Sequence, residues 1–130
     1  MIKMFMLFSH RLTSDQANDA KENFKIDEFI YLPGNLQEKW SNVPPNGELP
    51  DAYLDDIKKF LFQNKSDKNY VLVEGEYGLT HSMVNWCFKN SFIPVYSTTT
   101  RNSIMEGDKD GNIVNKHIFR HVQFRFYKAV

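Results

Sequence analysis

The stretch Asn69–Lys89 constrains the fold most, because it combines a buried strand, a glycine turn and a helix. Residues 70–73 form a continuous apolar run, typical of strands that a parallel sheet buries on both faces. Two glycines in residues 75–78 then interrupt the run and permit close backbone approach. Either Thr80 or Ser82 can cap the helix that follows. The unpaired N–H groups at this helix start predict an anion site, and the alternative is a plain connection between strand and helix.

The rest of the chain alternates between strand-like and helix-like segments. Thr13 and Gln16 have the spacing of a capping box, which predicts the start of a helix. The other expected strands cover residues 4–8, 28–32 and 92–96, and the other expected helices cover residues 36–40, 51–63 and 80–90. Such alternation predicts an α/β fold, a mostly parallel sheet with helices on both faces and right-handed crossovers. Length and continuity predict one domain over residues 1–130.

The last thirty residues have a different pattern. Asp110-Gly111 predicts an antiparallel β-hairpin at the C-terminus. Alternating apolar and polar residues between Ile113 and Tyr127 predict a half-exposed strand, and the alternation loses register near residues 119–120, which predicts a bulge. His117 and His121 are four residues apart, but no carboxylate partner is evident, so we expect no metal site there. The aspartates near the hairpin turn lack the later ligands of a calcium loop.

Composition excludes several classes of function. The chain has 16 basic and 16 acidic residues, so its net charge argues against binding to long nucleic acids. Its single cysteine, Cys87, excludes an intramolecular disulfide and a cysteine-based metal cage. No segment reaches transmembrane length, which predicts a cytoplasmic protein without a membrane partner. The sequence has no dinucleotide fingerprint and no Walker lysine, so we expect no nicotinamide, flavin or other cofactor.

Polar residues follow three of the expected parallel strands. In an open parallel sheet, ligands bind outside the carboxyl ends of the strands, and these three ends converge if strand 4–8 lies beside strand 70–73. Candidate catalytic residues are Ser9, His10 and Arg101. Candidate ligand-binding residues are Gly75, Glu76, Tyr77, Gly78, Thr80, Thr98 and Thr99. Structural roles remain open for each of them: Ser9 can hold a turn, His10 can be structural, and Arg101 can pair with Glu74, Glu76 or Glu106.

These residue types suit metal-independent cleavage of a phosphodiester by a neighbouring ribose hydroxyl. That reaction needs an in-line 2′ oxygen, charge stabilisation at the phosphate and help for proton transfer. Backbone N–H groups, threonine hydroxyls and Arg101 can stabilise charge. His10 is the best candidate acid or base, since a histidine titrates near neutral pH.

Several segments together resemble a small family of CRISPR-associated proteins from type III systems, the Csx family numbered twenty. The similar segments are MFMLFSHRLTSDQ, EFIYLPGNLQEKWSNVPP, YVLVEGEYGLTHSMVNWCFKNSFIPVYSTTTR and FRHVQFRFY. Members of that family are similar to the Rossmann-like domains that sense cyclic oligoadenylates. The resemblance implies a Rossmann-like three-layer domain and a ring nuclease that linearises cyclic tetra-adenylate to products with 2′,3′-cyclic phosphate ends.

The resemblance also implies a homodimer that binds the ring across its two-fold axis and switches off antiviral signalling. Carried onto this sequence, Ser9 and His10 end the first strand, Gly75–Thr80 form the phosphate turn, and Thr98, Thr99 and Arg101 end the last parallel strand. Two other readings stay open. One is a binding module that senses or sequesters the cyclic nucleotide without cutting it, and the other is an unrelated flavodoxin-like interaction domain.

Overall fold

A single five-stranded sheet runs through the protein, in the order β2-β1-β3-β4-β5. The computed structural model describes residues 1–130, apart from the side chain of His117. The strands are β1 (Ile2–Leu7), β2 (Glu28–Tyr31), β3 (Lys68–Val73), β4 (Ile93–Gly107) and β5 (Ile113–Phe126), and the helices are α1 (Ser14–Asn23), α2 (Gly34–Ser41), α3 (Asp55–Gln63) and α4 (Tyr77–Lys89). Strands β1 to β4 pair in parallel and β5 pairs antiparallel to β4. The predicted α/β fold with a C-terminal antiparallel hairpin is therefore confirmed.

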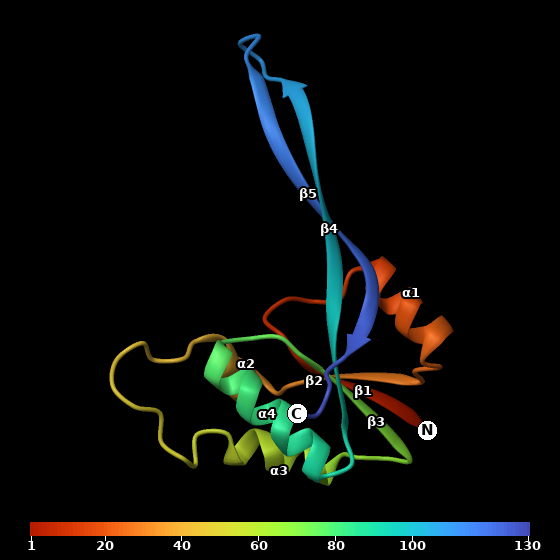
Figure 1. Cartoon of the computed structure of the whole chain (residues 1–130), viewed down its shortest axis with the longest axis vertical. Helices are drawn as coiled ribbons and strands as arrows, with labels where there is room; N and C mark the ends of the chain where they lie inside the picture. Colours follow the sequence, from red (N-terminus) through yellow and green to blue (C-terminus); the bar gives the residue numbers. More distant parts are fainter.

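Helices cover both faces of the parallel sheet, with α1 on one side and α2, α3 and α4 on the other (Figure 1). Alternate residues of β1 serve the two sides: Met4 and Met6 pack in the α1 cluster, whereas Phe5 and Leu7 pack in the opposite cluster. All four side chains are fully buried. This two-sided burial explains why the strand sequences are continuously apolar.

The chain leaves β1 in one direction to reach β2 and crosses to the other side of β1 to form β3. The strand order therefore reverses between β1 and β3, the place where open α/β sheets collect their ligands. The expectation that strand 4–8 lies beside strand 70–73 is confirmed, since Met4 pairs with Tyr70 and Leu7 with Val73.

Gly75 is required by the packing of Trp40 behind the end of β3. A Cβ atom on Gly75 would lie 2.7 Å from the Trp40 ring, which is 1% exposed. The indole Nε1 of Trp40 donates a hydrogen bond of 3.2 Å to the carbonyl of Glu74. The glycine at this position thus serves the core, because it lets α2 approach the backbone of the β3–α4 turn.

Beyond the body of the protein, β4 and β5 continue as a twisted two-stranded ribbon that projects far from the helices (Figure 1). We call residues 100–120 of this ribbon the arm. The sequence predicted a strand over 92–96 and a separate hairpin, but that strand and the first strand of the hairpin are one continuous strand, β4, of 15 residues. The β-favouring residues Thr98–Thr100 allow the strand to continue after its parallel pairing with β3 ends at Val95.

A β-bulge marks the base of the arm. Thr98 pairs with Gln123 and Thr99 pairs with His121, so Val122 has no opposite residue. The bulge was predicted near residues 119–120 and lies slightly later in the chain. Because of the bulge, His121 lies on the same face of β5 as Phe124, which packs in the α1 cluster.

Candidate functional site

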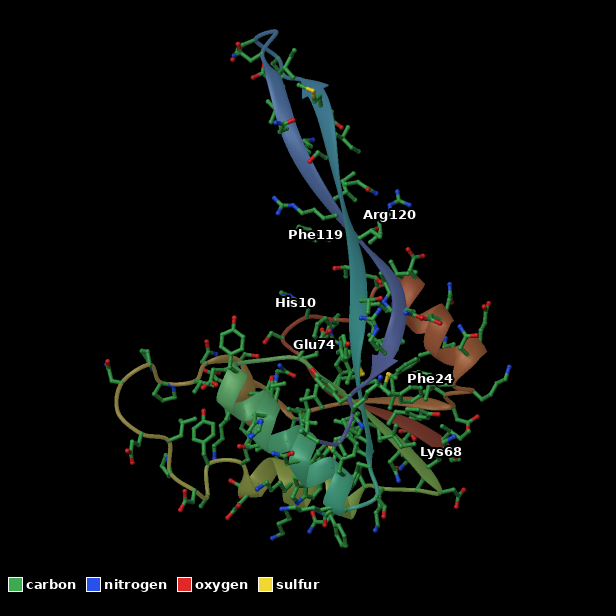
Figure 2. The ribbon with its side chains drawn as sticks, viewed as in Figure 1. His10, Phe24, Lys68, Glu74, Phe119 and Arg120 are labelled. Atoms are coloured by element: carbon green, nitrogen blue, oxygen red, sulfur yellow. The ribbon has the colours of Figure 1, made fainter. Side chains whose placement is uncertain are left out.

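A cavity of about 440 Å³ lies outside the carboxyl ends of β1, β3 and the parallel part of β4. It is at the point where the strand order reverses, and the base of the arm forms one of its walls (Figure 2). Its lining combines a carboxyl group, two imidazoles, a guanidinium and several hydroxyls with two phenyl rings. The lining residues are Phe8, His10, Arg11, Thr13, Gln16, Glu74, Ser97, Thr99, Phe119 and His121.

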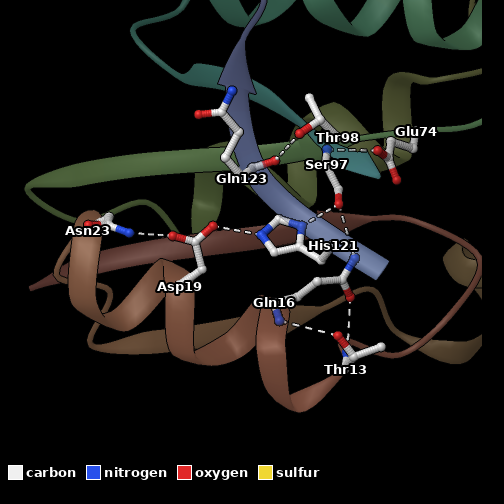
Figure 3. A network of polar contacts seen from close by, with 9 residues as sticks. All are labelled: Thr13, Gln16, Asp19, Asn23, Glu74, Ser97, Thr98, His121 and Gln123. Atoms are coloured by element: carbon white, nitrogen blue, oxygen red, sulfur yellow. Dashed lines mark hydrogen bonds and ion pairs between the residues drawn. The ribbon is translucent and has the colours of Figure 1, made fainter. Parts of the chain in front are cut away.

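A chain of hydrogen bonds joins Asp19, His121 and Ser97 along one side of this cavity (Figure 3). Asp19 Oδ2 lies 2.6 Å from Nε2 of His121, and Nδ1 of His121 lies 2.6 Å from Oγ of Ser97. Because the carboxylate accepts the Nε2 proton, the neutral imidazole has its lone pair on Nδ1 and accepts the Ser97 hydroxyl proton. The His121 side chain is 4% exposed, so its orientation is fixed by these two partners and by packing on Phe124.

Helix α1 supplies a second contact to Ser97. Gln16 Nε2 donates to Ser97 Oγ at 3.3 Å, and the same side chain accepts from the Thr13 N–H at 2.9 Å. The Thr13 hydroxyl in turn accepts from the Gln16 N–H, so the predicted capping box is confirmed. The cap that starts α1 therefore also positions a donor on the serine of β4.

Glu74, at the end of β3, holds Ser97 from the opposite direction. Its Oε1 accepts a hydrogen bond of 2.8 Å from the Ser97 N–H. Burial raises the pKa of the Glu74 carboxyl above its ordinary value, although the Ser97 N–H and the nearby His121 and His10 oppose that shift. In the cavity, burial thus favours the protonated form of this carboxyl group relative to that of an exposed glutamate.

The structure brings some of the predicted site residues together and separates others. His10 and Thr99 both line the cavity, and Ser9 lines an adjoining hollow that it shares with His10. Thr98 faces away from the cavity, and its hydroxyl donates to the Gln123 carbonyl at 3.2 Å. Arg101 lies on the arm, with its guanidinium 5.7 Å from the centre of the Phe119 ring.

The glycine turn lies outside this cavity, and its helix start differs from the prediction. Helix α4 begins at Tyr77 and its cap is Glu76, so the prediction that Thr80 or Ser82 caps it is wrong. The Glu76 carboxylate accepts from the N–H groups of Gly78 and Leu79. Thr80 faces back into the turn, where its hydroxyl accepts from the Gly75 N–H at 3.1 Å.

This local pairing has a chemical consequence. An anion at the start of α4 must compete with the carboxylate that already binds these N–H groups. Gly78 lines a separate hollow with α3, and Tyr77, 93% exposed, lines another hollow with Thr80. The cavity at the strand ends therefore has the better geometry for a ligand.

The sequence alone did not indicate Asp19, Ser97 or His121 as residues of the site. Asp19 lies in a helix for which the sequence showed only the capping box, and the sequence showed no carboxylate partner for His121. The structure corrects that assignment, because Asp19 is the partner of His121. Arg11 follows the predicted site residue His10, and Ser97 precedes the predicted site residue Thr98. Their place in the sequence was the only indication that they belong to the site. The side chain of His117, the other histidine of the proposed pair, lies outside the described residues.

The arrangement can transfer protons and bind an anion. His121 can accept a proton through Ser97, and His10 offers a second imidazole at the exposed rim. Arg11 places a guanidinium beside the cavity, where it stacks 4.8 Å from the centre of the Tyr31 ring. Over the side chains that the structure describes, no group of three or more His, Cys, Asp and Glu residues is arranged to hold a metal ion. None of the described helices is long and apolar enough to cross a membrane.

Fold and cavity together define an α/β domain with a polar site at the switch point of a mostly parallel sheet. The family described as "Uncharacterized protein MJ1673 family" matches residues 2–125, and the chain belongs to this family. It is 50% identical over 127 residues to "Uncharacterized protein MJ1673" of Methanocaldococcus jannaschii, and the match covers 98% of both chains. No solved structure matches the chain.

Proposed function

We propose that this protein is a ring nuclease that binds cyclic tetra-adenylate and linearises it without a metal ion. The observation that carries the proposal is the cavity at the sheet switch point, which combines the imidazole of His10, the guanidinium of Arg11 and the hydroxyl of Thr99. A phosphodiester needs a cation and hydroxyl donors for its phosphate and an imidazole for proton transfer. The resemblance to the CRISPR-associated family supplies the substrate. In this function the protein switches off type III CRISPR antiviral signalling, in the cytoplasm.

The size of the cavity fits one unit of such a ring. Pockets of a few hundred cubic ångströms bind single small molecules, and this one measures about 440 Å³. A ring of four nucleotides is larger than that, so one protomer holds only part of it. Two equivalent cavities related by a two-fold axis present equivalent groups to equivalent phosphates, and for this reason we propose a homodimer.

The arm supports the second copy as a partner. A two-stranded hairpin is only marginally stable alone in water, yet the arm exposes Phe119, Met105 and Ile113 to 63%, 68% and 70%. Directly opposite residues of an antiparallel pair share a face. The pairings Arg101–Phe119, Met105–Asn115 and Gly107–Ile113 therefore place these three side chains on the face of the arm that continues from Thr99 and His121 at the cavity.

Basic and acidic side chains are mixed along the arm. Asp108, Lys109 and Asp110 lie at its tip, an ion pair joins Glu106 to Lys116, and Arg101 and Arg120 lie near its base. Two arms that pack against each other about a two-fold axis bury the exposed apolar side chains of the arm between them. Residues 100–120 include four basic and three acidic residues, so the arm lacks the large surplus of one charge that a membrane surface or a long nucleic acid would require.

The catalytic proposal is tested by incubating the protein with cyclic tetra-adenylate in EDTA and separating the products by chromatography. Linear products with 2′,3′-cyclic phosphate ends are expected. His10→Ala is expected to lower the single-turnover rate by about tenfold or more, because it removes an acid–base group. Arg101→Ala, tested alongside, removes the predicted arginine on the arm, and an unchanged rate excludes it from the reaction. Tight binding of an intact ring would leave only the binding module, and no binding would remove both functions.

The dimer is tested by sedimentation velocity of the wild type and of a Met105→Ser/Ile113→Ser variant. The variant is expected to raise the dissociation constant by about tenfold or more, because each apolar side chain contributes roughly 1.5–3 kcal/mol when buried. Phe62→Ser is the matched control, since Phe62 is 53% exposed on α3, away from the arm. A wild type that stays monomeric at high concentration would contradict the dimer.

A further inference from the structure

We propose that Asp19, His121 and Ser97 form a relay that removes the proton from the attacking ribose hydroxyl, with His121 as the base and Ser97 in contact with the substrate. This inference rests on the proposed ring-nuclease function and names the groups that drive its first step. It starts from the geometry, in which two hydrogen bonds of 2.6 Å join a carboxylate, an imidazole and a hydroxyl in series.

The direction of proton flow follows from the partners at each atom. Asp19 is an acceptor only and binds the Nε2 proton, so Nδ1 is the basic nitrogen of the neutral ring. Ser97 gives its proton to Nδ1 and accepts from Gln16, which leaves one lone pair of its oxygen for a substrate hydroxyl. Asn23 also donates to the other oxygen of Asp19, so that carboxylate is held at both ends (Figure 3).

The position of the relay is suitable for substrate. Ser97 and His121 both line the cavity, whereas Asp19 lies behind them on α1. The groups are drawn from three separate elements: α1, β4 and the β5 segment just before the bulge. Asp19 is thus a positioning residue, and Ser97 is the group that meets the ribose.

A serine nucleophile is the competing interpretation of this triad, and the structure argues against it. Acyl or phosphoryl transfer to a serine is assisted by N–H donors that stabilise the developing oxyanion, commonly including the serine's own N–H. Here the Ser97 N–H donates to Glu74 at 2.8 Å. The Ser97 N–H is therefore not free to stabilise an oxyanion on the substrate.

The proposed step balances without any further reactant. The 2′ oxygen passes its proton to Ser97 Oγ as the Ser97 proton moves to His121 Nδ1, and the 2′ oxygen forms a bond to phosphorus. The bond from phosphorus to the 5′ oxygen breaks, and that oxygen takes a proton from the protonated imidazole of His10. One proton is consumed at His10 and one is gained at His121, and the imidazolium is stabilised by Asp19.

The test compares Asp19→Asn, Ser97→Ala and Ser97→Thr with Glu22→Gln, an exposed carboxylate on the same helix. For each protein, binding of cyclic tetra-adenylate and its single-turnover cleavage in EDTA are measured across the pH range. An asparagine at position 19 favours the tautomer with a proton on Nδ1, which cannot accept from Ser97. We therefore expect a rate loss of about 100-fold or more with binding changed less than about threefold.

The two serine variants and the pH profile separate a relay from a structural role. Ser97→Ala is expected to slow cleavage by about tenfold or more, and Ser97→Thr, which keeps the hydroxyl, to restore most of it. The rising limb of the pH–rate profile is expected to change in Asp19→Asn and to stay in place in Glu22→Gln. The charged groups around His121 that bear on this limb are Asp19 on α1, Glu74 after β3, and His10 and Arg11 after β1.

An independent measurement uses the wild type alone. Nitrogen-15 NMR of the His121 ring at high pH is expected to show the tautomer with a proton on Nε2, and a proton on Nδ1 would overturn the relay whether or not a variant folds. Wild-type protein that cleaves the ring while the Asp19 and Ser97 variants cleave it equally fast would overturn the relay alone. Wild-type protein that does not cleave the ring would overturn both the relay and the proposed function.

Discussion

Strands β4 and β5 pass through two very different regions, the layered body and the arm. In the body, Val95 and Phe124 are buried at 0% and 7% exposure, because α1 and the rest of the sheet cover them. In the arm, Met105 and Ile113 of the same two strands are 68% and 70% exposed. The two strands pair with each other in both regions, on either side of the bulge, so pairing alone does not determine burial. Whether a strand is part of a core depends on the layers stacked against it.

The body and the arm are expected to differ most in how much free energy of unfolding a large-to-small substitution removes. Trp40→Ala is expected to lower the free energy of unfolding by about 3–5 kcal/mol, because it empties a buried site in the body. Met105→Ala in the arm is expected to change the stability of the monomer by less than about 0.5 kcal/mol. Urea unfolding at a concentration where the chain is monomeric measures both. Equal losses would show that the arm belongs to the core.

Substitution of one glycine in the body and one in the arm is expected to give a second, smaller difference in stability. Gly75→Ala is expected to cost roughly 1–3 kcal/mol, because its new methyl group would overlap the Trp40 ring. Gly107→Ala places the same methyl group in open space on the arm, with nothing within 4 Å. Its effect on unfolding should stay within about 0.5 kcal/mol. Thermal unfolding of the two variants is the measurement, and similar shifts in midpoint would contradict the assigned role of Gly75.

The smallest expected effect is the pH dependence of stability that arises from Glu74, in the cavity between the body and the base of the arm. Because the pKa of Glu74 is raised in the folded state, the native protein binds a proton more tightly than the unfolded chain does. Its stability should therefore fall as pH rises from about 4.5 through the raised pKa and then level off. Glu74→Gln keeps an oxygen that can accept from Ser97 and should remove this slope, with slightly higher stability at neutral pH.

Unfolding measured at several pH values gives the slope. Glu106→Gln in the arm is the matched control, because its ion pair with Lys116 is exposed, and it should leave the slope unchanged. A slope that persists in Glu74→Gln would assign it to another carboxyl group.

The sequence predicts the body well because burial leaves a local pattern. The continuous apolar run at residues 70–73 correctly indicates a strand covered on both faces, and the spacing of Thr13 and Gln16 correctly indicates the start of α1. The arm was missed as an extension of β4 because Thr98–Thr100 favour a strand whether or not a layer covers them. The local sequence does not show at which residue a strand extends beyond the helices that cover the sheet.

The sequence predicted that the candidate site lies at the carboxyl ends of the strands, but it predicted only some of the residues that line it. His10 and Thr99 lie where the rule for open sheets places them. The glycine turn has the pattern of an anion site, but the carboxylate of Glu76 already binds the N–H groups at the start of α4. A pattern that predicts an anion site can therefore be filled by a side chain of the same protein. The unpaired Val122 places His121 on the same face of the β4–β5 pair as Ser97, within reach of Asp19 on α1, and periodicity in one strand does not reveal such partners.

The bond between Asp19 and His121 joins residues that are 102 positions apart in the chain. A growing polypeptide can include β1, α1, β2, β3 and β4 and still lack His121 beside Ser97, because β5 is the last strand to be synthesised. Contacts of such long sequence separation form late, after the loop between them has closed. Asp19, Ser97 and His121 therefore come together only after β5 has been synthesised, and a chain terminated before β5 lacks His121.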